Sequence, residues 1–290
     1  MKDQLIFGCA ALSSMSNRCE VFQLLEEAVS QGITHFDTAR SYGRGYSEKL
    51  LGEFFRAHGG ALAVTTKFGV TYSKTDACPT AIALPLNWAV KRLRDIGYGI
   101  WDMGKDSGVK GLRGSGSSKA ESGRRKVEKK PSTISDLPSS LTAKVGRDVV
   151  ERSVEESLRQ LGKERGEILL LHEMLPGQLT EEARGYLEGL RKAGTVGRLG
   201  CGTNREVLER HFREDPMVEV LQYEGSATER PGLMAKFPGK VHIHHSLFRG
   251  VGRGGHGVAL RRALELNPGG KVIFSTRSRE HLRENLEGLG

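Results

Sequence analysis

Short apolar runs recur along the 290-residue chain, with amphipathic stretches between them. Each run is short enough to form a buried strand. The runs begin near residues 5, 33, 61, 167, 196, 218, 240 and 271. Leucines at helical spacing, separated by charged residues, predict helices over 21–30, 47–56, 149–161, 181–193 and 280–286. Strands that alternate with helices predict a parallel sheet.

Eight predicted strands favour a closed (β/α)8 TIM barrel in the α/β class. An open doubly wound sheet remains the alternative, because weak strands are difficult to count. The length suits a single domain over 1–290. Polar residues such as Asp37, Lys67 and His172 stand at the carboxyl ends of apolar runs. This is the face of a barrel where enzymes place their chemistry.

Residues 70–148 interrupt this alternation and predict a long insertion after the third strand. Within it, 85–101 has enough large apolar residues to be ordered, whereas 105–130 is rich in Gly, Ser and charge and predicts disorder. Residues 105–147 hold seven Lys and four Arg against four acids, which is +7 of the chain's formal +9. Such confined charge, without aromatic residues for stacking, argues against nucleic-acid binding.

The chain carries no sign of a membrane or an oxidising compartment. No apolar run approaches the roughly 18 residues needed to span a bilayer. The opening segment resembles a signal peptide, but Lys2 and Asp3 cancel where positive charge is needed, so we interpret it as a buried strand. The cysteines are far apart and form no CxxC pair: Cys9, Cys19, Cys78 and Cys201. These features predict a cytoplasmic protein.

One segment carries a specific motif. A strand ending in Asp37-Thr38-Ala39 leads into Tyr42-Gly43, Gly45, Ser47-Glu48 and Leu51-Gly52. This pattern resembles the aldo-keto reductase superfamily, whose motif is a strand ending in DTA followed by YGxGxSExxLG. Residues 153–173 and 272–286 resemble two further blocks of that family. The similarity covers nearly all of the chain outside 70–148.

The resemblance implies a catalytic tetrad of Asp37, Tyr42, Lys67 and His172. Reduction of a carbonyl needs a hydride for the carbon and a proton for the oxygen, and an ordinary phenol, with a pKa of about 10, is a slow donor at neutral pH. We expect Lys67 to lower the pKa of Tyr42, Asp37 to hold the lysine, and His172 to orient the substrate oxygen. Tyr46 is the competing phenol, but it occupies a variable position of the motif.

The resemblance also implies a nicotinamide coenzyme. Thr203, Asn204 and Gln222 would meet the carboxamide, while His245 would take the place of the aromatic that stacks on the ring, which is a departure from the family. The other expected coenzyme residues are Ser246, Arg249, Gly250, Ser275, Thr276, Arg277, His281 and Asn285. Arg277 can pair with a 2′-phosphate, so NADPH is favoured over NADH. The predicted activity is NADPH-dependent reduction of an aldehyde or ketone.

Two motifs suggest other functions. Residues 250–255 match GxGxxG, but only one predicted strand follows, so a Rossmann domain cannot be built around them. In a barrel they form the loop after the seventh strand, where Arg249 or Arg253 could approach the pyrophosphate. His242 and His244 share one face of a strand and could bind a metal with His172 and Asp37, as in a metal-dependent barrel hydrolase. We predict no metal site.

A non-catalytic, NADPH-binding regulatory protein is the remaining alternative, although the chain retains all four tetrad residues. The identity of the carbonyl substrate lies beyond the sequence. We expect the insertion at 70–148 to cover the substrate pocket, with Trp88, Tyr98 or Trp101 as contacts.

Overall fold

Eight parallel strands form the centre of the computed structural model, which describes residues 1–59, 61–69, 144–225, 232–252 and 254–289. Each of the eight apolar runs in the sequence overlaps one of these strands. The strands are β1 (Leu5–Gly8), β2 (His35–Asp37), β3 (Ala63–Phe68), β4 (Gly166–His172), β5 (Val196–Gly202), β6 (Val220–Glu224), β7 (Val241–His245) and β8 (Lys271–Phe274).

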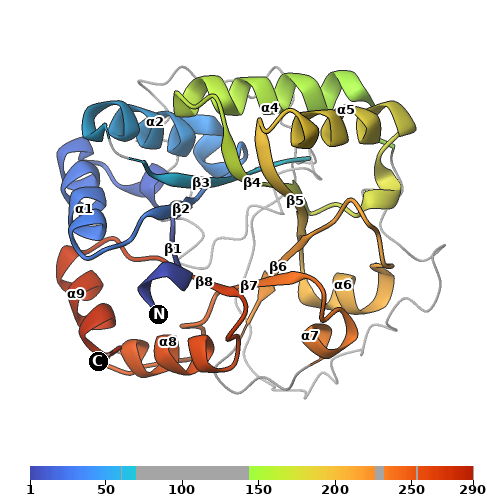
Figure 1. Ribbon diagram of the computed structural model, residues 1–290. Coiled ribbons are helices and arrows are strands. Elements are labelled where there is room, and N and C mark those ends of the chain that lie inside the picture. Colours follow the sequence, from blue (N-terminus) through green and yellow to red (C-terminus); the bar gives the residue numbers. More distant parts are fainter. Residues whose placement is uncertain (60, 70–143, 226–231, 253, 290) are drawn as a thin grey trace, which may run out of the picture.

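Each strand pairs in parallel with its neighbours in the sequence, and the last strand pairs with the first. The register of this closing pair sets Leu5 opposite Val272 and Phe7 opposite Phe274. The sheet is therefore a closed barrel, which confirms the predicted TIM barrel and rules out the open-sheet alternative. Figure 1 shows the strands around the centre and the helices outside them.

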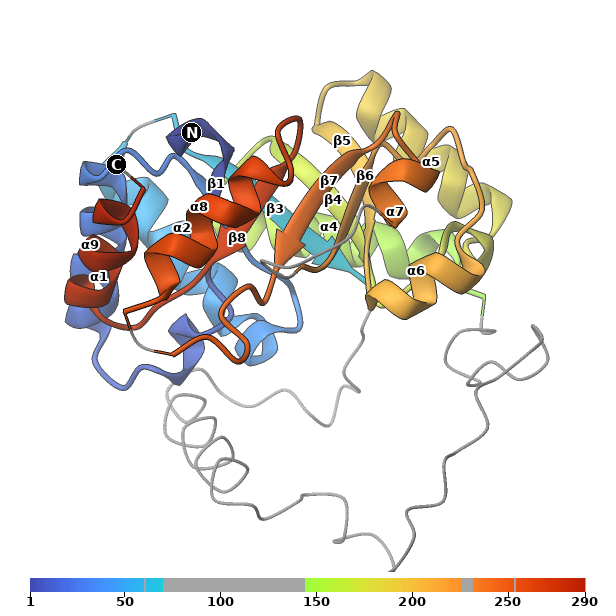
Figure 2. The same ribbon diagram turned by 90° about the horizontal axis from the view of Figure 1, so that it is seen from below.

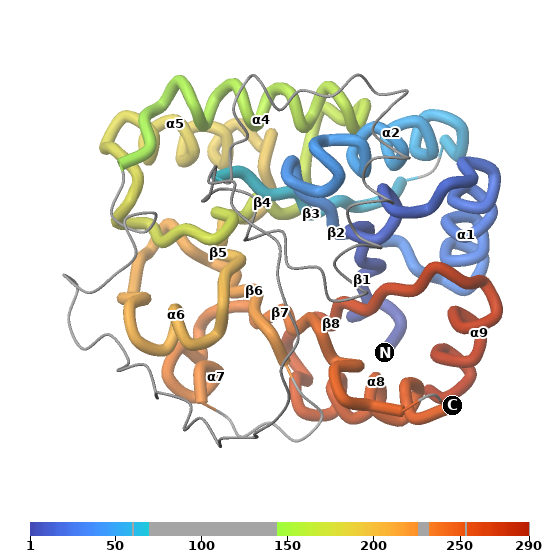
Figure 3. The backbone as a smooth tube through the Cα atoms, turned by 180° about the vertical axis from the view of Figure 1, so that it is seen from behind, coloured from blue at the N-terminus to red at the C-terminus, as the bar shows by residue number. Residues whose placement is uncertain are grey.

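The helices are amphipathic and cover the outside of the barrel. The described helices are α1 (Arg18–Ser30), α2 (Tyr46–His58), α4 (Arg147–Leu161), α5 (Glu181–Lys192), α6 (Arg205–His211), α7 (Leu233–Lys236), α8 (His256–Glu265) and α9 (Arg279–Glu287). Asn17 caps α1 by accepting from the Cys19 and Glu20 amides, and Thr180 and Ser278 cap α5 and α9 in the same way. Seen from behind, α9 lies beside α1, so the last helix meets the first around the closed barrel (Figure 3).

Alternation along the strands separates two apolar regions. Ile6, Ile168, Leu170, Ile243 and Ile273 pack together with Val220 inside the barrel. Two larger clusters pack between the strands and the helices. Successive strand residues point to opposite faces, so these assignments fix which side chains of each strand face the lumen.

The insertion expectations fall mostly outside the described residues. Residues 70–143, which include Trp88, Tyr98, Trp101 and the 105–130 segment, belong to the undescribed part of the chain (Figure 2 draws them as a thin trace). One boundary is corrected: α4 begins at Arg147, two residues before the predicted start, so the predicted insertion to 148 ends too late.

Among the described residues, no helix combines the length and apolar character that crossing a membrane requires. Cys9 and Cys201 are buried and Cys19 is exposed, and all three are free thiols. Cys78 lies outside the described residues. The cytoplasmic location stays a prediction.

Candidate active site

The loop after β2 places Tyr42 at the carboxyl end of the barrel. Gly43, Arg44 and Gly45 have φ angles of 57°, 56° and 87°, a left-handed turn for which glycine is favoured. Directly after this turn α2 begins, and the Ser47 hydroxyl donates to the Cys9 carbonyl at 2.6 Å. The glycines and the serine of the motif thus fix the turn that carries Tyr42.

The rest of the motif fixes α2 against its neighbours. Glu48 is fully buried, accepts from Thr66 at 2.7 Å and lies 3.5 Å from Arg40. Burial raises the pKa of Glu48, although Thr66 and the Arg40 cation oppose this. A Cβ on Gly52 would lie 1.9 Å from the Gln160 carbonyl oxygen of α4, so only glycine allows the two helices to approach this closely.

Lys67 is the centre of the predicted tetrad. Its buried ammonium donates to Asp37 Oδ1 at 2.5 Å, to the Thr38 carbonyl at 2.8 Å and to the Tyr42 hydroxyl at 3.4 Å. The second oxygen of Asp37 accepts from Gln222 Nε2 at 2.7 Å, across the lumen from β6. The structure therefore brings three tetrad members into direct contact and adds Gln222 to them.

The acid strength of Tyr42 depends on burial as well as on Lys67. Burial raises its pKa, and the Lys67 cation lowers it without outweighing burial, while Asp37 raises it further. Burial also lowers the pKa of Lys67, but Asp37 and Tyr42 together raise it above its ordinary value. Lys67 thus lowers the pKa of Tyr42 as predicted, and desolvation of the phenolate, which the sequence does not reveal, is the larger effect and raises it overall.

His172 completes the tetrad as a neutral imidazole. Burial lowers its pKa to about 3, and the Lys67 cation and His245 lower it as well. Its ring meets the Tyr42 ring edge to face, with centroids 5.8 Å apart. Its Nδ1 lies 3.2 Å from the Ser41 hydroxyl. If Ser41 donates to Nδ1, the ring proton is on Nε2 and can be donated to a substrate oxygen.

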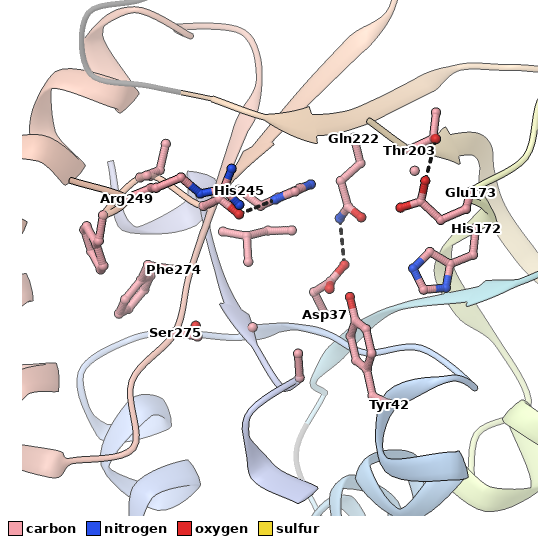
Figure 4. Close-up of a pocket in the computed structure, with 17 residues that line it drawn as sticks. Asp37, Tyr42, His172, Glu173, Thr203, Gln222, His245, Arg249, Phe274 and Ser275 are labelled. Carbon is pink, nitrogen blue, oxygen red and sulfur yellow. Dashed lines mark hydrogen bonds between the residues drawn. The ribbon is translucent and has the colours of Figure 1, made fainter. Parts of the chain in front are cut away.

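These side chains open into a cavity of about 570 Å³ at the carboxyl end of the barrel. Figure 4 shows Tyr42, Asp37 and His172 on one side of it and Arg249, Phe274 and Ser275 on the other. Six of the predicted coenzyme residues line this cavity: Thr203, Gln222, His245, Ser246, Arg249 and Ser275. Burial lowers the pKa of His245, so its ring is uncharged at neutral pH.

Six other predicted coenzyme residues are outside the lining: Asn204, Gly250, Thr276, Arg277, His281 and Asn285. Asn204 is exposed and caps α6, accepting from the Glu206 amide at 2.8 Å. The Thr276 hydroxyl bonds to the backbone of Ser278, and Asn285 is buried in α9. Arg277 and His281 are exposed around the start of α9, so their coenzyme role stays a prediction.

The histidine cluster of β7 does not form the metal site considered as an alternative. Ile243 faces the lumen, so His242 and His244 point outward, away from His172 and Asp37. Both contact the buried Tyr223 hydroxyl, at 2.9 and 3.0 Å. Within the described residues no group of three or more His, Cys, Asp or Glu side chains could hold a metal ion.

Sequence reasoning missed two polar residues of the site. Ser41 contacts His172, and Glu173 lines the cavity and accepts from Thr203 Oγ1 at 2.7 Å. Each stands beside a tetrad residue in the chain, which is the only signal that the sequence offers. Glu173 also has a φ of 52°, which only the folded backbone reveals.

The comparisons agree with this fold. Residues 4–105 match the family model described as aldo/keto reductase family, and no curated protein matches the chain. A provisionally assigned aldo-keto reductase from Pseudomonas aeruginosa has 18% identity and a TM-score of 0.63, with 99% of this chain and 89% of that chain covered. An aldo-keto reductase from Bacillus halodurans, in its holo form, has 13% identity and a TM-score of 0.61, covering 99% and 86%.

A mutant of the protein named Gox0644, solved in complex with NADPH, has 18% identity and a TM-score of 0.57, covering 99% of this chain and 83% of that chain. At these identities the solved structures share the fold. Residues 4–105 are thus similar to the aldo/keto reductase family, and the chain shares the barrel fold of these solved structures.

Proposed function

We propose that the protein is an NADPH-dependent oxidoreductase that reduces an aldehyde or ketone to an alcohol, with Tyr42 as the proton donor. The observation that carries this proposal is the contact of one buried ammonium, on Lys67, with both Asp37 and the Tyr42 hydroxyl at the edge of a cavity. The match of residues 4–105 to the aldo/keto reductase family supports an oxidoreductase.

Each side chain has a definite role in this reaction. Reduced nicotinamide supplies a hydride to the carbonyl carbon when it is bound. Tyr42 gives its proton to the oxygen as negative charge develops there, and Lys67 stabilises the phenolate that remains. An alkoxide is a much stronger base than a phenolate, so the transfer is favourable even with the raised pKa of Tyr42. Neutral His172 donates from Nε2 to the same oxygen and orients it.

The cavity suits a nicotinamide coenzyme in size and in its polar groups. Its volume of about 570 Å³ falls within the range of ligand sites, roughly 300–1,000 Å³. Gln222 gives its NH2 group to Asp37, so its oxygen remains to accept from a carboxamide. Thr203 donates to Glu173, so its oxygen can also accept. His245 would stack on the ring, and Arg249 lies toward the end where phosphates would bind.

The preference for NADPH over NADH rests on Arg277, which is exposed just before α9. Its planar guanidinium can pair with a 2′-phosphate that NADH lacks. We expect Arg277→Ala to weaken NADPH binding on the order of tenfold and to leave NADH binding unchanged. Equal losses for both coenzymes would contradict a 2′-phosphate role.

The test of the activity follows NADPH absorbance with a panel of aldehydes and ketones, comparing wild type with Tyr42→Phe. We expect turnover by the wild type and its loss in the variant, with coenzyme binding retained. Normal turnover by the variant would show that Tyr42 is not the donor. Tight NADPH binding without turnover of any carbonyl by the wild type would instead favour the regulatory alternative.

A further inference from the structure

Glu173 lines the cavity beside His172 but has no part in the reduction described above. It follows His172 directly at the end of β4, and one of its oxygens accepts from Thr203. Among the described residues no hydrogen bond engages its other oxygen, Oε1. Figure 4 shows the carboxylate beside His172, on the side of the cavity opposite Arg249.

The backbone at Glu173 holds an unfavourable conformation. Its φ of 52° lies in the left-handed region, where a side chain costs energy that glycine would not. Such strain persists where the surrounding structure imposes it, and it concentrates at functional sites. A glutamate at this position therefore calls for a function of its side chain.

Glu173 also dominates the charge at its end of the cavity. Both oxygens of Asp37 are engaged, one by the Lys67 ammonium and the other by Gln222. His172 and His245 are neutral, because burial lowers the pKa of each. The acids among the described lining residues are Asp37 and Glu173, and of these two Asp37 is paired with a cation, Lys67, whereas Glu173 is not.

We propose that Glu173 selects substrates by charge: its carboxylate disfavours carbonyl compounds that carry an anionic group and favours those that carry a cationic group. This inference rests on the proposed carbonyl reduction and names the substrate class of the same site. An anionic substituent brought beside Glu173 meets like charge, and even for an exposed carboxylate such as this one two charges about 4 Å apart repel by about 1 kcal/mol in water. A cationic substituent meets an acceptor oxygen that the protein leaves open.

The test compares three benzaldehydes that differ at the para position: carboxylate, nitro and trimethylammonium. The measured quantity is kcat/KM for each charged aldehyde divided by that for the nitro compound, with NADPH. In Glu173→Gln, which still accepts from Thr203, we expect the carboxylate ratio to rise and the trimethylammonium ratio to fall, each on the order of fivefold to tenfold. Unchanged ratios would overturn the proposal.

Glu164→Gln is the matched control, because Glu164 is exposed two residues before the amino end of β4, on the opposite face of the barrel. It removes the same charge from the protein and should leave both ratios unaltered. If it shifts them as Glu173→Gln does, the effect comes from net charge and the proposal fails. Glu173→Gly, which relieves the backbone strain, should reproduce the glutamine result in a well-folded protein.

A binding measurement separates this proposal from the proposed reduction. Calorimetry with the benzyl alcohols that carry the same three substituents reports their affinity for the protein with NADPH, and no turnover occurs because the alcohol and the coenzyme are both already reduced. The trimethylammonium alcohol should bind wild type more tightly than the carboxylate alcohol, and Glu173→Gln should remove the difference. If the protein reduces no aldehyde but still shows this binding preference, the proposed reduction fails and the charge selection stands. If wild type binds the two charged alcohols equally well, the charge selection is overturned.

Discussion

Replacement of Gly52 by alanine tests the packing that supports the Tyr42 turn. A Cβ there would lie 1.9 Å from the Gln160 carbonyl oxygen and 2.9 Å from the Leu161 Cα. These are backbone atoms of α4, which no rotamer change can move. Ordinary contact begins near 3.4 Å, so α2 and α4 would have to separate by more than an ångström.

Overpacking of this kind costs about 3 kcal/mol, and the better helix propensity of alanine returns about 1 kcal/mol. We therefore expect Gly52→Ala to lower the free energy of unfolding by about 2 kcal/mol or more. Gly185 in α5 is the matched control, because nothing lies within 4 Å of its Cβ position. Gly185→Ala should stabilise the protein by about 1 kcal/mol.

The assay is urea unfolding followed by circular dichroism, with the midpoint and slope compared among wild type and both variants. The two alanine variants should differ by about 3 kcal/mol, with opposite signs relative to wild type. If Gly52→Ala is as stable as wild type, the close approach of α2 to α4 is wrong. Carbonyl reduction should also fall in Gly52→Ala, because Glu48 and the Tyr42 turn move with α2.

Three further predictions concern the site and the buried histidines. Burial lowers the pKa of His35 and His172 to about 3 and that of His244 to about 4. As pH falls below about 6.5, these histidines become protonated in the unfolded chain but stay neutral in the folded protein. The free energy of unfolding should therefore drop by about 1.4 kcal/mol per histidine between pH 7.5 and 5.5. Equal urea midpoints at the two pH values would contradict this. Lys67→Met leaves Asp37 buried without its cation and should lower the free energy of unfolding by about 3–5 kcal/mol. Adding Asp37→Asn should restore part of this loss. A double variant no more stable than Lys67→Met would argue against a charged pair. Arg249→Ala should raise the Kd for NADPH on the order of tenfold in a fluorescence titration, and an unchanged Kd would remove Arg249 from the coenzyme site.

The fold and the positions of the proposed tetrad could be predicted because they follow from local signals. Apolar runs of strand length fixed the barrel strands, and the motif from Asp37 to Gly52 located Tyr42 among several phenols. Lys67 and His172 followed from strand ends, because parallel strands in a barrel finish on one face. The structure confirms the barrel and brings these groups together.

The remaining features depend on contacts between distant segments. Strand alternation places His242 and His244 on one face, but only the packing of Ile243 in the lumen shows that this face is outside. The pKa of Tyr42 depends on burial, which the sequence does not state. The left-handed backbone at Glu173 and its contact with Thr203 arise from two strands and a loop that the chain pattern treats separately.

The pairing of β1 with β8 has a consequence for how the chain reaches its native state. Leu5 finds its partner in the closing pair at Val272, more than 260 residues later in the chain, so a ribosome must synthesise the chain through β8 before the ring can close. Until then, the growing sheet presents two unpaired edges, which are open to pairing with other chains. The protein is thus most exposed to aggregation during synthesis, and chaperones that bind exposed strand edges and apolar surface would be needed most just before β8 emerges.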